Sequence, residues 1–196
     1  AALGAASALV AAVLWLRLDV FDLLPWLVCF VVLTIASERV ELARLHRPAG
    51  SERTLLLLAS LVVVATAATL VAPDLGTRVF GLAVLALTLW TAVGDVARRT
   101  IRTSGLPRYS AAAMLLGYGW LVLAAVMWVV SGRPDSRAAY DLVVHAVFLG
   151  FAMSMVLAHA PIILPAVIRR PLPYHPVLWA LLLFLQGALV LRLGIG

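Results

Sequence analysis

Four histidines are the side chains in this sequence best suited to hold a metal ion or a haem. Two of them, His145 and His159, lie fourteen residues apart within one apolar run. In a regular α-helix that spacing falls about 40° short of four full turns and rises about 21 Å, so both rings point from one face. Ionisable groups inside apolar helices are costly and often functional. Because the two rings are so far apart, one haem cannot use both of them.

Asp141 lies four residues before His145 and on the same helix face, within reach of an (i, i+4) contact. A carboxylate that accepts a hydrogen bond from one ring nitrogen orients the imidazole and leaves the other nitrogen for a metal. Asp141 is therefore a candidate partner for a ligating His145. The alternative is an ion pair of the two side chains at a helix end, near the lipid headgroups.

His159 and His175 flank one short connection that is rich in proline and arginine. Pro161 removes a backbone donor and kinks the helix, which leaves polar backbone next to His159. We expect His159 and His175 to approach each other and form a cofactor site, with Arg169 and Arg170 pairing with haem propionates. The alternatives are a His159 that hydrogen-bonds a freed carbonyl on a neighbouring helix, and a His175 on an exposed turn.

Glu38 and Glu41 lie three residues apart at the end of another apolar run and share a helix face. They are candidate metal ligands beside the three histidines, since neutral imidazole suits copper, zinc and haem iron, or candidate groups of a proton path. The alternative is a network of arginine–glutamate pairs at the headgroups. His46 lies in a basic loop and is expected to be solvated. The single cysteine, Cys29, excludes an intrachain disulfide and a cysteine-based zinc site.

The composition assigns these residues to a membrane protein. Of the 196 residues, 64% are hydrophobic and 12% are charged, whereas a soluble domain carries about 25% charged residues. With no water at depth, each apolar run must satisfy its own backbone, so helices are expected. The sequence predicts one all-α domain over residues 1–196, a bundle of about seven transmembrane helices at 1–18, 20–44, 54–72, 78–97, 110–131, 140–168 and 172–193.

The arginines predict the orientation of this bundle, because loops rich in Arg and Lys stay in the cytoplasm. All the basic residues are arginines, and the net charge of +6 comes from loops between apolar runs rather than from a nucleic-acid-binding surface. We expect a cytoplasmic N-terminus, lipid as the main partner and no nucleic acid. One side holds ten arginines (39, 44, 47, 53, 98, 99, 102, 108, 169 and 170) and the other holds five (17, 78, 133, 137 and 192).

One stretch resembles a known group of proteins. The sequence HAVFLGFAMSMVLAHAPIILPAV, which begins at His145, is followed by PYHP around His175. It resembles bacterial membrane proteins related to the NnrS family and, more distantly, haem-copper oxidase subunits. That resemblance implies haem b, with copper as an alternative, in the bacterial plasma membrane, and it makes His145, His159 and His175 the ligand candidates. This chain lacks the His–His pair of those proteins, which argues against an oxygen-reducing centre.

These observations lead to three hypotheses for the function. The first is a haem- or copper-binding membrane protein that acts in respiratory electron transfer or in handling nitric oxide or oxygen. The second is a non-catalytic accessory subunit that packs against other membrane subunits. The third is a small transporter or proton channel with histidines in its pore, although two related halves, which many transporters have, are not evident. The sequence leaves enzymatic activity open.

The predicted orientation can be tested by labelling single cysteines introduced into a Cys29→Ser background. A cysteine at position 102 should react with an impermeant reagent only from the cytoplasmic side, because its loop is rich in arginine. A cysteine at position 135 should react only from outside. Labelling of position 135 from the inside alone would reverse the orientation.

Overall fold

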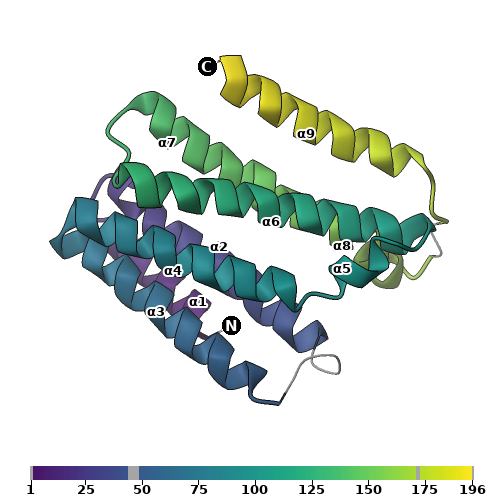
Figure 1. Cartoon of the computed structure of the whole chain (residues 1–196), viewed down its shortest axis with the longest axis horizontal. Helices are drawn as coiled ribbons and strands as arrows, with labels where there is room; N and C mark the ends of the chain where they lie inside the picture. The colour runs from purple at the N-terminus through teal and green to yellow at the C-terminus, as the bar shows by residue number, and fades with distance from the viewer. Residues whose placement is uncertain (1, 44–48, 171–172, 196) are drawn as a thin grey trace. The chain divides into compact units, whose positions relative to one another are not determined.

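The computed structural model describes residues 2–43, 49–170 and 173–195, and within these ranges the regular structure is helical, without a β-strand (Figure 1). The α-helices flank one π-helix, which is labelled η2. In chain order the elements are α1 (Ala2–Leu14), α2 (Val20–Leu42), α3 (Ser51–Val71), α4 (Pro73–Val93), α5 (Ala97–Thr100), α6 (Gly105–Ser131), α7 (Arg137–Val144), η2 (His145–Met153), α8 (Ser154–Ile168) and α9 (Val177–Ile195).

Six of the described helices are long and apolar enough to cross a membrane: α2, α3, α4, α6, the continuous α7–η2–α8 segment and α9. The chain is an all-α integral membrane protein, as the sequence predicts. Each of the seven predicted runs corresponds to a helix, but the first is short. Helix α1 has 13 residues and ends at Leu14, whereas a membrane span needs about 20 residues. The exposed side chains of the long helices are largely apolar, which suits contact with lipid.

The chain forms two compact units, and each is described by itself. The first unit comprises Ala1–Asp95 and Val122–Tyr140, and the second comprises Val96–Leu121 and Asp141–Gly196. The first therefore holds α1 to α4 and the second part of α6. The second holds α5, the first part of α6, η2, α8 and α9. The expectation of one polytopic domain stays a prediction.

Helices α3 and α4 of the first unit form a tight hairpin (Figure 1). Pro73 occupies the first turn of α4, where a missing N–H leaves no helical bond unmade. One turn later the backbones approach so closely that a Cβ on Gly76 would lie 2.5 Å from the carbonyl oxygen of Ala68. The absence of a side chain at position 76 thus allows the two helices to pack.

The buried hydroxyl groups of this hairpin are satisfied inside their own helices. Thr66 Oγ1 donates to the Val62 carbonyl at 2.8 Å, and Thr88 Oγ1 donates to the Val84 carbonyl at 2.7 Å. Thr69, Thr77 and Thr91 make equivalent bonds to carbonyls three or four residues earlier. Such bonds allow a polar side chain to be buried without a partner on another helix. The threonines therefore leave the helix faces free to pack through apolar atoms.

The end of α6 is held against α4 in the same unit. Gly81 allows the approach, since a Cβ there would lie 2.8 Å from Trp128 Cβ, and the rings of Phe80 and Trp128 meet edge to face at 5.1 Å. Arg78 Nη1 donates to the carbonyls of Val129 and Val130 at 3.0 and 2.6 Å. These are carbonyls at a helix C-terminus, which lack helical donors. A single arginine thus caps the neighbouring helix.

The second unit is joined by a line of polar side chains from three helices. Trp120 Nε1 on α6 donates to Gln186 Oε1 on α9 at 2.5 Å, and Gln186 Nε2 donates to Ser154 Oγ on α8 at 2.9 Å. Gly150 makes room for the Trp120 ring, which a Cβ at that position would strike. Interhelical hydrogen bonds and small residues are the usual means by which helices associate in lipid, where apolar surfaces gain little by meeting. They attach α9 to the rest of this unit.

The close approach at Gly76 predicts an asymmetric response to two matched substitutions. Gly76→Ala should destabilise the protein by about 1–3 kcal/mol, because the new methyl group forces the α3–α4 hairpin apart. Gly119→Ala is the control, since a Cβ at Gly119 meets nothing within 4 Å. Thermal unfolding of the detergent-solubilised variants measures both effects. Equal stability of the two variants would contradict the close packing.

Candidate functional site

His145 is the first residue of the π-helix and is held by two groups of Asp141. Its Nδ1 lies 2.8 Å from the Asp141 carbonyl oxygen and 3.4 Å from Asp141 Oδ1. The carboxylate is shared with α9, because Arg192 Nη2 contacts Asp141 Oδ1 at 3.1 Å. All three side chains are partly exposed. The spacing in the sequence predicts the contact of Asp141 with His145, while the contribution of Arg192 comes from packing.

His159 on α8 is oriented by an equivalent bond. Its Nδ1 lies 2.6 Å from the carbonyl oxygen of Met155, one turn earlier in the same helix. This carbonyl is not the one that Pro161 frees, which belongs to Leu157. Pro161 and Pro165 both lie within the helix, which continues to Ile168.

The two Nδ1 bonds fix the tautomers of His145 and His159. A carbonyl oxygen only accepts hydrogen bonds, so the Nδ1 atom that faces it must carry the hydrogen. In the neutral ring the lone pair then resides on Nε2. An Nδ1–H bonded to a backbone carbonyl is also the usual arrangement around a metal-ligating histidine, since it orients the ring and raises the basicity of Nε2.

The π-helix alters the geometry expected for these two histidines. It extends for nine residues from His145 to Met153, between α7 and α8. A π-helix bonds residue i to residue i+5, so it takes more residues for each turn than an α-helix does. The shared face and the separation predicted for His145 and His159 assume a regular α-helix over the whole interval, and that assumption does not hold. Segments of π-helix occur frequently at functional sites.

His175 has the opposite tautomer and a local structural role. Its Nδ1 accepts a hydrogen bond from the backbone N–H of Val177 at 3.1 Å, at the start of α9. Nδ1 therefore carries the lone pair, and Nε2 carries the hydrogen when the ring is neutral. The side chain is exposed, as are Arg169 and Arg170. Arg169 ends α8 in a left-handed conformation with φ of 53°, and residues 171 and 172 between these groups lie outside the described ranges.

The two glutamates proposed as ligands belong to the first unit. Glu38 and Glu41 are both exposed on the last turns of α2. His46 lies outside the described residues. Within residues 2–43, 49–170 and 173–195, no group of three or more His, Cys, Asp or Glu side chains is close enough to hold a metal ion. A site built from several such side chains is therefore not preformed in the described part of the chain.

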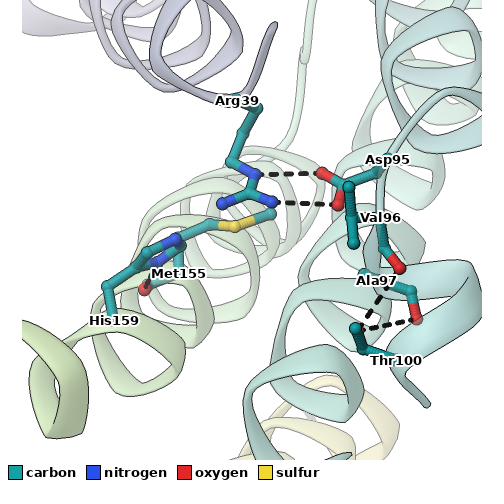
Figure 2. Close-up of polar contacts among 7 residues, drawn as sticks. All are labelled: Arg39, Asp95, Val96, Ala97, Thr100, Met155 and His159. Atoms are coloured by element: carbon teal, nitrogen blue, oxygen red, sulfur yellow. Dashed lines mark hydrogen bonds and ion pairs between the residues drawn. The ribbon is translucent and has the colours of Figure 1, made fainter. Parts of the chain in front are cut away.

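Sequence reasoning missed one charged pair that is buried within the described residues. Arg39 Nε and Nη2 donate to Asp95 Oδ2 and Oδ1, each at 2.9 Å (Figure 2). The side chains are 9% and 0% exposed, respectively. The pair joins the last turns of α2 to the residues that follow α4. The signal in the sequence is Asp95 itself, an acidic residue that closes an apolar run, but its partner lies 56 positions away.

Comparison with known proteins gives one match. The model of a protein family described as Domain of unknown function (DUF8744) matches residues 1–196. The chain belongs to this family. No curated protein and no solved structure matches the chain. The family covers the whole chain, so both units and all the candidate residues above are part of it.

The Arg39–Asp95 pair generates a prediction about stability. Arg39→Ala or Asp95→Ala should each cost about 3–5 kcal/mol, because the remaining charge stays buried without its main partner. Replacing both residues by apolar ones of similar volume, as in Arg39→Met with Asp95→Leu, should recover most of that loss. Thermal unfolding in detergent measures the three variants. Single variants as stable as the unchanged protein would show that the pair carries no stabilising role.

Proposed function

We propose that this chain is a haem-binding membrane protein that acts in electron transfer or in handling a small gas such as nitric oxide or oxygen. The observation that carries the proposal is the matched orientation of His145 and His159. Each donates its Nδ1–H to a carbonyl one turn earlier, so each neutral ring has its lone pair on Nε2. Two apolar helical segments thus orient imidazoles through Nδ1, as is usual for histidines that ligate a metal.

The donor arrangement favours haem over copper. Haem iron needs only one or two axial side chains, and a single histidine is a sufficient proximal ligand. Blue-copper sites, in contrast, combine two histidines with a cysteine. His145 and His159 are each separate axial-ligand candidates. Copper is the alternative metal, and it would require further ligands to come together when the metal binds.

His145 is the stronger of the two candidates. It begins the π-helix, and a carboxylate lies 3.4 Å from its Nδ1. When bound, haem would supply reversible one-electron chemistry or a site for a diatomic gas. Asp141 would keep the His145 ring oriented and increase electron density on Nε2. The Arg192 guanidinium contacts the same carboxylate and partly offsets its negative charge. Arg169 and Arg170 are exposed guanidinium groups of the same unit, and we propose them as partners for haem propionates.

The same proposal covers the setting of the protein. Resemblance to NnrS-related proteins supports a bacterial plasma membrane, and the arginine distribution supports a cytoplasmic N-terminus. Electron transfer would require a partner, so we propose that the chain works beside other membrane subunits. An accessory subunit without a cofactor is the competing function.

The proposal is tested by the optical spectrum of the purified protein and of three histidine variants. The unchanged protein should show a Soret band and bind haem stoichiometrically. His145→Ala and His159→Ala should each lower the haem content, because each removes an oriented Nε2. His175→Ala should retain it, since His175 Nδ1 is engaged with the start of α9. Metal analysis of the same samples detects copper.

The variant Asp141→Asn distinguishes two roles of Asp141: the partner of a haem-ligating His145, or a charged residue that only pairs at a helix end. The variant keeps the backbone carbonyl that faces Nδ1 and removes only the carboxylate charge 3.4 Å away, so haem affinity should fall by less than the about 10–100-fold typical of a lost hydrogen-bond partner. Thermal stability in the absence of haem should stay the same. A protein with neither colour nor stoichiometric metal would end the haem proposal and favour the accessory subunit.

A further inference from the structure

The first unit contains a cavity that is separate from the histidines. Its volume is about 150 Å³, and it is partly open to the outside. It is formed where α2 and α4 begin and where α3 and α6 end, together with the loop after α6. The residues that line it are Leu18, Phe21, Asp22, Leu24, Pro25, Thr69, Leu70, Pro73, Thr77, Trp128, Arg133 and Pro134.

Most of the cavity wall is apolar, and its two hydroxyl groups are already partly used. Thr69 Oγ1 donates to the Thr66 carbonyl at 2.7 Å, and Thr77 Oγ1 donates to the Pro73 carbonyl at 2.6 Å. Each hydroxyl proton is thereby engaged, while the oxygen retains lone pairs that can accept a hydrogen bond. The Trp128 side chain is fully buried and presents an aromatic surface to the cavity. The interior thus suits an apolar ring that carries a hydrogen-bond donor.

The two charged residues of the wall form an ion pair. Arg133 Nη2 contacts Asp22 Oδ1 at 2.5 Å, and the side chains are 48% and 35% exposed, respectively. Because the two charges balance, the pair has little net attraction for the phosphate of a lipid headgroup. It offers a strong donor next to a strong acceptor. This combination recognises an uncharged group that either accepts or donates a hydrogen bond.

The size of the cavity restricts the ligand further. A cavity of about 150 Å³ admits a molecule the size of benzene, whereas pockets for whole drug-sized ligands measure about 300–1,000 Å³. Only the ring of a larger amphiphile would fit, and its tail would extend into the lipid around exposed side chains such as Phe21 and Leu70.

We propose that this cavity binds the ring of a membrane quinone or quinol. A quinone carbonyl accepts from the Arg133 guanidinium, and a quinol hydroxyl donates to the Asp22 carboxylate. The ring lies against Trp128, and the isoprenoid tail remains in the lipid. This site is independent of haem, because its residues belong to the first unit and His145 and His159 belong to the second.

The test is a titration of the detergent-solubilised protein with a decyl-substituted benzoquinone, read as quenching of tryptophan fluorescence. Specific binding saturates, whereas collisional quenching within the micelle does not and is common to all variants. Arg133→Gln should raise the dissociation constant of the quinone at least about tenfold, since it removes the charge-assisted donor to the quinone carbonyl. Asp22→Asn should weaken binding of the corresponding quinol by a similar factor, measured by its competition with the quinone, since it removes the carboxylate that accepts from the quinol hydroxyl. Thr69→Leu, which fills the cavity with apolar atoms, should abolish saturable quenching.

Asp135→Asn and Arg137→Gln are matched controls, because Asp135 in the loop after α6 and Arg137 at the start of α7 are both exposed and neither lines the cavity. They should bind the quinone as the unchanged protein does. Thermal unfolding of every variant shows that it remains folded, and the comparison is restricted to those that do. Decanol, which has the tail without the ring, should not compete.

Non-saturating quenching in the unchanged protein would overturn the proposal. Unchanged quinone affinity in Arg133→Gln together with unchanged quinol competition in Asp22→Asn would also overturn it. Displacement of the quinone by decanol at equal concentration would make the cavity a site for acyl chains instead. None of these results depends on haem, whose presence is read independently from the Soret band.

Discussion

Water is absent from the bilayer core, and each polar group that a helix takes there must find a partner inside the protein. The buried threonines bond to their own helices, and Arg78 supplies donors for the carbonyl end of α6. Gln186 links Trp120 to Ser154. These contacts lie on different helices, but each satisfies polar groups that water cannot reach. They also determine which faces of the helices can pack together.

The same constraint explains why the helices were predictable and their partners were not. Apolar runs and prolines such as Pro73 mark the helices, since length, hydropathy and a missing N–H are local properties. Gly117 and Gly150 are points of close approach in the second unit, and a small residue within an apolar run is a local signal of such contacts. The pairing of Arg39 with Asp95 depends on how α2 packs beside α4. No local pattern encodes it, because the two residues are 56 positions apart.

In the candidate site, too, some contacts follow from local sequence spacing and others depend on how the helices pack. The contact between Asp141 and His145 follows from a spacing of four residues, which a helix converts directly into proximity. The contribution of Arg192 to that carboxylate requires α9 to lie alongside and was not foreseen. The ring tautomers also escaped prediction, because they depend on which backbone atom faces each Nδ1. The expectation for His175 rested on the short proline- and arginine-rich connection to His159 and on a resemblance, whereas its bond to Val177 is made by the start of α9.

Because of the π-helix, the directions of His145 and His159 depend on the number of residues between them as well as on the residue types. In an α-helix the direction of a side chain follows from its position in the sequence. A π-helical turn contains more residues than an α-helical turn, so the same number of residues completes fewer turns. Two chains with identical histidines and identical neighbours would present those histidines in different directions if they differed by one residue between positions 145 and 153. Within this family, a gap or an insertion in that interval would therefore redirect the two histidines relative to each other, even where neither histidine is substituted.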